Sequence, residues 1–384
     1  MVFATCSIQQ CALLRRHGSA GYASFPLETA HRRPLIRIPR SRRSARWGTN
    51  LTAWRSRMSI KVGNVEAKAG KLERGELRVG SMADGSPIEL PVFIACGRKD
   101  GPIVWLEGCI HGEEYGGAAS IIQFMRNLDL STLSGTIIGI PVANPASFNF
   151  RSRVSSIDGQ NLNRIFPGDL AGSHSVQLAA VIGEHLEKHA DFLIDLHSGG
   201  IGAEVPFYVI YKDDGTQNAT RSKDLAKRVG VETIWRVPEA QGMGGTVTAE
   251  ALRHNIPSVT VECGGGTFTQ KHLDDYLVSI NGFLQATGNL SGNAPVRDGY
   301  TIISGGSFIH NREGGLFVPE CKVGDILPKG RMIGRLINLH GETVEEIPNP
   351  YEDSYIAALR CNYFPTHAGE ICAEAIPVEA REGL

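Results

Sequence analysis

Cysteines are few in this sequence, and long apolar runs are missing from it. The 384 residues include eight cysteines, scattered along the chain without a CxxC pair. This density is too low for a disulfide-linked scaffold, so we expect a reducing compartment, the cytoplasm, with most cysteines buried as small apolar side chains. No uninterrupted apolar run reaches about 18 residues, the length that a membrane-spanning helix requires. The sequence therefore predicts a globular protein with no membrane span.

Acidic residues are almost missing from residues 1–57, which contain eleven Arg, no Lys and one acid, Glu28, for a net charge of 11 − 1 = +10. This basic leader is typical of a mitochondrial transit peptide, of a disordered tail, or of upstream sequence before a true start at Met58. A transit peptide would make the location mitochondrial. Residues 58–384 hold 39 − 11 = 28 basic and 40 − 1 = 39 acidic residues, a net charge of −11. This charge argues against binding nucleic acid.

Short apolar runs alternate with helical patterns along residues 86–290. Strands are predicted at 102–107, 136–142, 192–196 and 258–261, and helices at 115–128, 176–189, 246–253 and 273–284. This alternation predicts an α/β fold with a mostly parallel sheet covered on both faces. Beyond residue 290, short apolar runs separated by glycine pairs predict strands and turns only. The predicted domains are thus a catalytic domain at 58–290 and an all-β domain at 291–384.

One short motif carries a pair of metal-binding side chains. His111 and Glu114 form an HxxE pattern between the predicted strand 102–107 and the helix that follows it. Three residues are close to one helical turn, so both side chains point the same way. Imidazole nitrogen and carboxylate oxygen are both ligands of zinc. HxxE is common by chance, and Glu113 is a rival carboxylate, so the pair requires support from a third ligand.

His197 supplies that third ligand in our interpretation. It ends the apolar run 192–196 and precedes Ser-Gly-Gly. The carboxyl ends of parallel strands meet at one edge of a sheet, so we expect His197 to lie near His111. Asp195 lies two residues earlier on the same strand face, where it can orient a ligand imidazole. Alone, such a histidine also fits a hydrogen-bonded core residue.

Glu262 ends a third apolar run and precedes Cys-Gly-Gly-Gly. A carboxylate at the end of a buried strand is unfavourable unless it lines a cleft or forms a buried ion pair. A zinc-activated water requires a general base and then a proton donor for the leaving amine. If Glu262 lines a cleft, it is therefore the candidate for this acid/base role.

A loop rich in hydrogen-bond donors lies between the second and third ligands. It contains Arg151, Arg153 and the run Asn161-Leu162-Asn163-Arg164. A guanidinium binds a carboxylate through two parallel hydrogen bonds. Arg153, Asn163 and Arg164 are therefore predicted to bind a substrate carboxylate, with Arg151 as a near alternative to Arg153. The other interpretation is a solvated loop.

These motifs occur in the order HGEE, NPA, NLNRIFPG, LIDLHSGG and TVECGGG. Together they resemble the succinylglutamate desuccinylase/aspartoacylase family of zinc deacylases, from about residue 60 to the C-terminus. The resemblance implies a zinc carboxypeptidase-like fold, in which helices flank a mixed, mostly parallel sheet, followed by a C-terminal all-β domain. It also implies one zinc ion per subunit with His111, Glu114 and His197 as ligands, Glu262 as catalytic acid/base, and Arg153, Asn163 and Arg164 as substrate-binding residues.

One residue departs from the family pattern. Dedicated aspartoacylases and succinylglutamate desuccinylases usually read DLNR, whereas this chain has Asn161 in the first position. The form with asparagine resembles the broader deacylase branch, which includes enzymes that act on N-acetyl-diaminobutyrate from ectoine breakdown. N-acetylaspartate and succinylglutamate are thereby disfavoured as substrates.

The function predicted from the sequence is zinc-dependent hydrolysis of the amide bond of a small N-acyl amino acid. A carboxypeptidase acting on short peptides is the nearest alternative, because it shares the ligands. A ligand-binding protein without turnover is a third hypothesis. The expected partner is the small-molecule substrate, with no nucleic acid and no membrane, and a homo-oligomer is left open.

Overall fold

The computed structural model describes residues 59–242 and 244–383. The basic leader at 1–57, Met58 and two of the eight cysteines, Cys6 and Cys11, lie outside the described residues. The cysteines in the described part are free, and four of them are buried: Cys96, Cys109, Cys263 and Cys372. None of the helices described is both long and apolar enough to cross a membrane. The cytoplasmic location stays a prediction.

A thirteen-stranded mixed sheet forms the centre of the described chain. Its strands are β3 (Lys71–Ser81), β4 (Pro87–Cys96), β5 (Lys99–Gly108), β6 (Ser134–Ile140), β7 (Phe192–His197), β8 (Ala203–Asp213), β9 (Thr233–Pro238), β10 (Ser258–Gly265), β11 (Tyr300–Ile303), β12 (Ser307–His310), β14 (Ile326–Leu327), β17 (Ser354–Arg360) and β19 (Ile371–Glu382). The hydrogen-bonded order is β14-β17-β19-β11-β9-β8-β10-β7-β5-β6-β4-β3, and β12 pairs with β19.

The sheet contains two runs of parallel strands, β6-β5-β7-β10 and β8-β9-β11. Strands β6, β5, β7 and β10 run parallel to one another. Antiparallel strands extend the sheet on both sides, with β4 beside β6 and β8 beside β10. The predicted mixed sheet is confirmed. Strands β3, β4 and β8 have no counterpart among the sequence predictions, and their direction follows from pairings between distant segments.

Helices cover both faces of the sheet. Apolar side chains of α1 (Tyr115–Asn127), α4 (Gln217–Ala226) and α6 (Gln270–Thr287) share one core cluster. Those of α3 (His174–His189) and α5 (Val247–Arg253) share the other. The ends of α6 have a local cause, because Thr269 and His272 form a capping box and Gly288 ends the helix at φ 85°. The short helices are α2 (Pro145–Phe150), η1 (Leu162–Arg164) and η2 (Glu239–Gln241).

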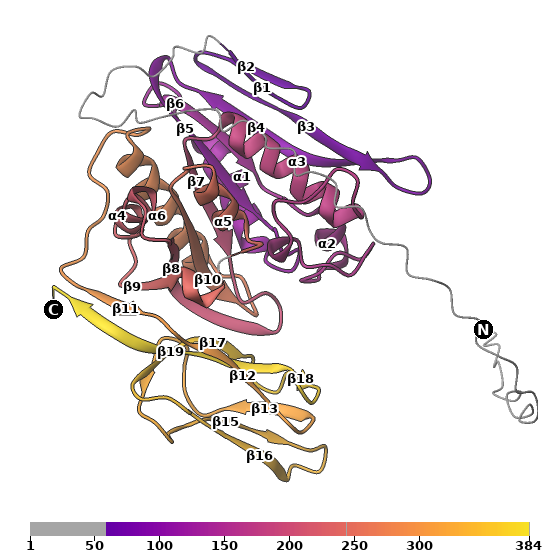
Figure 1. Ribbon diagram of the computed structural model, residues 1–384, viewed down its shortest axis with the longest axis vertical. Helices are drawn as coiled ribbons and strands as arrows, with labels where there is room; N and C mark the ends of the chain where they lie inside the picture. Colours follow the sequence, from indigo (N-terminus) through magenta and orange to yellow (C-terminus); the bar gives the residue numbers. More distant parts are fainter. Residues whose placement is uncertain (1–58, 243, 384) are drawn as a thin grey trace, which may run out of the picture. The chain divides into compact units, whose positions relative to one another are not determined.

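Beyond α6 the described residues form strands without helices, as predicted. A four-stranded antiparallel sheet contains β13 (Gly315–Pro319), β15 (Met332–Ile337), β16 (Thr343–Pro348) and β18 (Pro365–Thr366). The other C-terminal strands continue the central sheet, since β17 pairs with β8 and β11 pairs with β9 (Figure 1). A separate hairpin, β1 (Ser59–Val62) and β2 (Val65–Lys68), precedes the central sheet. The domain boundary at residue 290 stays a prediction.

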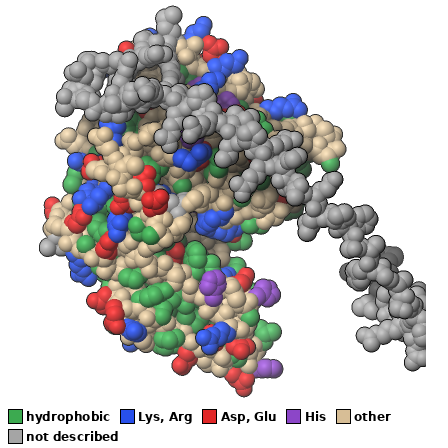
Figure 2. All heavy atoms as spheres, viewed as in Figure 1, with side chains coloured by type: hydrophobic (Ala, Val, Ile, Leu, Met, Phe, Trp, Pro, Cys, Tyr) green, Lys and Arg blue, Asp and Glu red, His purple; other side chains and the backbone are tan. Residues whose placement is uncertain are grey.

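On the face drawn in Figure 2, basic and acidic side chains are interspersed among apolar ones. The described part of this face therefore shows no broad surface of a single charge. Such a mixed surface gives little long-range attraction for a polyanion.

Candidate metal centre

Three side chains from separate segments meet at the carboxyl edge of the parallel strands. His111 lies in the loop after β5, Glu114 is the N-cap of α1, and His197 is the last residue of β7. All three are buried, and each offers a ligand atom, with these atoms within 4.8 Å of one another. The sequence prediction named the same three residues, from the HxxE spacing, the strand end at His197 and the family resemblance.

Glu114 lies between the two imidazole rings. Its Oε1 is 2.7 Å from His111 Nδ1, and its Oε2 is 2.9 Å from His197 Nδ1. The ring centroids of the two histidines are 5.0 Å apart. Two imidazole nitrogens and one carboxylate oxygen are the donor set of many catalytic zinc sites, in which three protein ligands suffice. The residues present therefore fit a zinc ion.

The loop that carries His111 follows the backbone of α2 closely. Gly112 N–H donates to Ser147 Oγ at 3.1 Å and to the Ser152 carbonyl at 2.9 Å. A Cβ at residue 112 would lie 2.0 Å from the Ser147 carbonyl carbon, so only glycine permits this approach. The glycine of the HGEE motif thus fixes the position of His111 beside it.

Burial and mutual charge set the protonation of the ligands. Burial raises the pKa of Glu114, but the neighbouring His111 and His197 outweigh it and hold that pKa well below its usual range. Burial lowers the pKa of His197, but Asp195 and Glu114 raise it well above its usual value. His197 therefore holds a proton in the absence of metal, and it must release that proton when zinc binds.

Hydrogen bonds behind the ligands orient them. Asp195 Oδ2 lies 2.7 Å from His197 Nε2, which is the contact that the strand spacing predicts. Asn161 Oδ1 lies 3.0 Å from His111 Nε2. The Tyr276 hydroxyl donates to the His197 carbonyl at 2.5 Å. Each imidazole therefore has its outer nitrogen engaged and its Nδ1 turned to the metal group.

The Asp195→Asn variant is expected to bind zinc about 10–100-fold more weakly. Asparagine keeps the shape of the side chain but removes the charge that holds His197 Nε2–H. Competition with a chromophoric chelator measures the affinity, with Asp100→Asn, exposed on β5, as the control. Equal affinity in both variants would contradict this role for Asp195.

A second buried carboxyl group stands beside Asp195. Glu107 is opposite Asp195 in the β5–β7 register and accepts a hydrogen bond from Trp105 Nε1 at 2.7 Å. Burial, with the charge of Asp195, raises the pKa of Glu107 to about 8. The neutral form of Glu107 is thus favoured at neutral pH.

Glu262 lies on β10, directly opposite His197 in the parallel pairing of β10 with β7. Its carboxylate makes no hydrogen bond and no ion pair with the described residues, and the side chain is only half-buried. Burial raises the pKa of Glu262 to about 8, and the negative charge of Glu114 adds to this effect against the opposing charge of His197. A free carboxyl group of near-neutral pKa beside a metal ligand is suited to proton transfer.

The structure distinguishes the two arginine candidates, Arg153 and Arg151. It also shows that the three predicted substrate-binding residues have different surroundings. Arg153 Nη1 donates to Glu114 Oε1 at 3.1 Å, whereas Arg151 is exposed at the left-handed end of α2. Arg164 is exposed and donates to the Asn163 carbonyl at 2.7 Å. Asn163 is buried, with Oδ1 accepting from Val247 N–H at 2.9 Å and Nδ2 3.4 Å from His197 Nε2.

Arg164 and Arg153 lie close enough to affect each other. Although the Arg164 side chain is exposed, partial removal of its guanidinium from water lowers its pKa, and the positive charge of Arg153 lowers it further, against the opposing charges of Glu374, Glu114 and Glu262. No ion pair among the described residues involves Arg164. Two guanidinium groups held near each other form a cationic region that favours the binding of an anion.

Some site residues carry little signal in the sequence. The departure from DLNR draws attention to Asn161, but the sequence does not predict its contact with His111. Glu107 and Tyr276 belong to a strand and a helix whose patterns indicate only burial. Their roles depend on side-chain packing across the sheet, which periodicity does not report.

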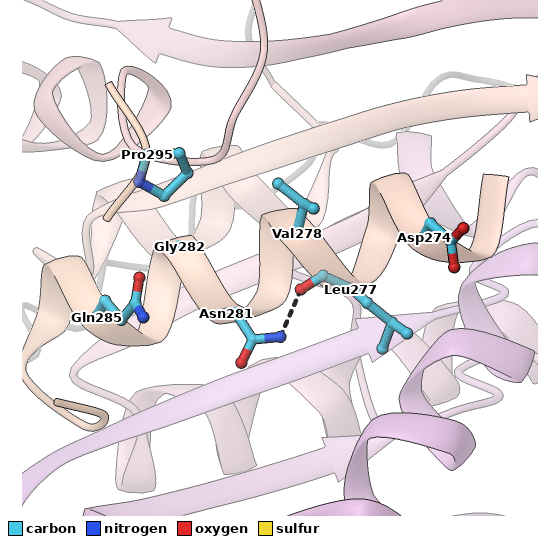
Figure 3. Close-up of a pocket in the computed structure, with 7 residues that line it drawn as sticks. All are labelled: Asp274, Leu277, Val278, Asn281, Gly282, Gln285 and Pro295. Atoms are coloured by element: carbon cyan, nitrogen blue, oxygen red, sulfur yellow. Dashed lines mark hydrogen bonds between the residues drawn. The ribbon is translucent and has the colours of Figure 1, made fainter. Parts of the chain in front are cut away.

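A separate hollow lies along one face of α6, lined by six residues of that helix and by Pro295 (Figure 3). Among these lining residues Asp274 alone is ionisable. Asn281 Nδ2 donates to the Leu277 carbonyl within the same helix. The metal group does not line this hollow, which offers no comparable set of reactive side chains.

A helix-covered mixed sheet with a His-Glu-His group at the ends of parallel strands defines a hydrolase of the zinc carboxypeptidase-like class. Residues 100–287 match the model of the succinylglutamate desuccinylase/aspartoacylase catalytic domain. The chain is 28% identical over 329 residues to the N-alpha-acetyl-L-2,4-diaminobutyric acid deacetylase of Halomonas elongata, covering 83% of this chain and 95% of that protein.

Solved structures agree with this match. A succinylglutamate desuccinylase/aspartoacylase from Rhodobacter sphaeroides superposes with a TM-score of 0.72 at 22% identity, covering 80% of this chain and 96% of the other. The product-bound ectoine utilization protein EutE (DoeB) from Ruegeria pomeroyi gives 0.71 at 21% identity, covering 80% and 95%. The chain belongs to the succinylglutamate desuccinylase/aspartoacylase family of amide-hydrolysing enzymes.

Proposed function

We propose that this protein is a zinc-dependent deacylase that hydrolyses the amide bond of a small N-acyl amino acid. The observation that carries the proposal is the position of Glu262. Its free carboxylate lies opposite His197 in the strand register, while His197, Glu114 and His111 form the ligand group. A metal group and an unpaired acid side by side are the two parts that amide hydrolysis requires.

His111, Glu114 and His197 would hold the zinc ion. When bound, zinc supplies a Lewis acid for the amide carbonyl and lowers the pKa of a nearby water. Glu262 takes the proton of the attacking water and then gives it to the nitrogen of the leaving amine. Asp195 and Asn161 hold the two imidazoles, so that the ligands need not reorganise during the reaction.

Arg153, Asn163 and Arg164 are proposed to bind the carboxylate of the substrate. The two arginines supply paired donors, and Asn163 supplies Nδ2, since its Oδ1 is already engaged. Fixing the carboxylate fixes the scissile amide relative to Glu262, which converts binding energy into orientation. Residues 58–290 form the catalytic domain in this proposal, and residues 291–384 add a β-domain at its edge.

The named activity of the Halomonas relative suggests where to begin. That protein deacetylates N-α-acetyl-L-2,4-diaminobutyric acid, as its name states. The relative is 28% identical to this chain along most of both lengths, and Asn161 also departs from the DLNR form of dedicated aspartoacylases. We therefore propose N-acetyl amino acids, including N-acetyl-diaminobutyrate, as the first substrates to test.

The free carboxylate of the substrate is expected to raise kcat/KM by at least about 30-fold over the matching carboxamide. A carboxamide leaves the arginines without an anionic partner. The zinc-loaded enzyme is assayed for release of free amine from N-acetyl amino acids, their carboxamides and unblocked dipeptides. Preference for dipeptides would support the carboxypeptidase alternative instead. The absence of any amide hydrolysis by zinc-loaded, folded protein would contradict the proposal.

A further inference from the structure

Two carboxyl groups lie on adjacent strands in the core behind the metal centre. Glu107 of β5 is directly opposite Asp195 of β7 in the parallel register, and both side chains are fully buried. Residues paired in this way point to the same face of the sheet, and neighbouring strands are about 4.8 Å apart. On its other side, Glu107 is opposite Ile140 of β6, which is buried and apolar. The strand pairing therefore gives Glu107 a polar neighbour at Asp195.

In each of these carboxyl groups one oxygen has a partner and the other has none. Trp105 Nε1 donates to Glu107 Oε2 at 2.7 Å, and Asp195 Oδ2 lies 2.7 Å from His197 Nε2. Among the described residues, Glu107 Oε1 and Asp195 Oδ1 are buried without a hydrogen-bond partner. Buried polar atoms are normally hydrogen-bonded, so two such oxygens at paired positions call for a common explanation.

A single proton between the two groups satisfies both oxygens. Two ionised carboxylates repel each other strongly in a buried core, which favours retention of one proton by the pair. A carboxylic acid has the O–H donor that a carboxylate lacks. In agreement with this pairing, burial and the charge of Asp195 raise the pKa of Glu107 to about 8, against the opposing effects of Trp105 and His197.

We propose that Glu107 is a positioning residue, whose neutral carboxyl group donates a hydrogen bond from Oε1–H to Asp195 Oδ1. This bond fixes the carboxylate plane of Asp195, so that Oδ2 stays directed at the zinc ligand His197. The inference rests on the proposed zinc-dependent function and adds one residue to the hydrogen bonds behind the metal. Partners of this kind orient a ligand imidazole before the metal binds.

The surroundings of the pair place the proton on Glu107. Asp195 faces an imidazole that is positive when protonated or metal-bound, whereas the hydrogen bond to Glu107 comes from a neutral indole. A positive neighbour favours an ionised carboxylate more than a neutral donor does. Asp195 is therefore the acceptor, and Glu107 donates.

The test compares two neutral replacements of Glu107. Glutamine supplies both bonds, because its Oε1 can accept from Trp105 and its Nε2 can donate to Asp195. Methionine has a similar size but leaves Asp195 Oδ1 without a donor. Zinc affinity, measured by competition with a chromophoric chelator, should fall about 10-fold in Glu107→Met and stay near the wild-type value in Glu107→Gln. Equal weakening in both variants, or no weakening in either, would overturn the proposal.

Two further variants show whether Glu107 acts through Asp195. In an Asp195→Ala background, which lacks the acceptor, Glu107→Met should weaken zinc binding no further. An additional 10-fold loss there would mean that Glu107 acts on the metal by another route, against the proposal. Thr136→Val is the control, since it removes a buried polar contact with Cys96 and should keep wild-type affinity. Thermal unfolding of each variant checks that it is folded.

Infrared spectroscopy of the metal-free protein gives a readout that does not depend on zinc. The difference between wild type and Glu107→Gln at neutral pH should contain the C=O band of a protonated carboxylic acid. This comparison stands even if Glu107→Met does not fold. A carboxylate band in its place would show that Glu107 is ionised and would overturn the proposal. Wild-type protein that shows the acid band but binds no zinc would contradict the proposed function, while the band would still support the Glu107–Asp195 pair.

Discussion

The Glu262→Gln variant is expected to lose about 10³-fold in kcat while it still binds zinc. Glutamine preserves the size and polarity of the side chain but cannot accept and return a proton. The zinc ligands lie on other strands and loops, so the metal group should remain intact. The effect should fall on kcat more than on KM, because the lost interaction acts in the transition state.

Steady-state kinetics with an N-acetyl amino acid and elemental analysis of the same sample test this prediction together. Glu204→Gln is the matched control, because Glu204 is exposed on the neighbouring strand β8 and makes no contact with the metal group. It should retain wild-type turnover. A Glu262→Gln enzyme with wild-type kcat would remove Glu262 from the mechanism, whereas loss of zinc in this variant would give it a structural role.

The second large effect distinguishes two adjacent glutamates. Glu114→Gln should weaken zinc binding by more than about 100-fold, since even residues behind the ligands typically contribute 10–100-fold. Glutamine removes the negative charge that offsets the dication between two histidines. Glu113→Gln should bind zinc as the wild type does, because the Glu113 carboxylate is outside the ligand group.

Zinc affinities of the two variants, measured by competition with a chromophoric chelator, decide the assignment. Activity should follow metal occupancy in both. The reverse pattern, with Glu113→Gln losing zinc, would identify Glu113 as the ligand and require a different arrangement of the loop after β5. Thermal unfolding in the presence of a chelator controls for loss of fold.

Strand ends were the most informative feature of the sequence. His111, His197 and Glu262 each follow an apolar run, and parallel strands bring such positions to one edge of a sheet. The hydrogen-bonded register of β5, β7 and β10 confirms that these ends are adjacent. Predicting the convergence required only the direction of the strands, which alternation with helices indicates.

The rest of the site depends on pairings that no local pattern reveals. Tyr208 lies directly opposite Glu262 only because β8 pairs antiparallel with β10, a pairing between segments about fifty residues apart. Asn161 meets His111 because a short 3₁₀ turn places its side chain behind the ring. Register and antiparallel direction between distant strands are fixed by tertiary packing, so residues of this kind appear only in the structure.

The central claim is that one zinc ion at His111, Glu114 and His197 enables amide hydrolysis. The most direct test is to strip the metal with a chelator and then add zinc in steps while release of amine from N-acetyl-2,4-diaminobutyrate is measured. Activity should be negligible at the start, rise in proportion to added zinc, and level off at one equivalent per chain. Full activity in the stripped protein, or activity that does not respond to zinc, would contradict the account.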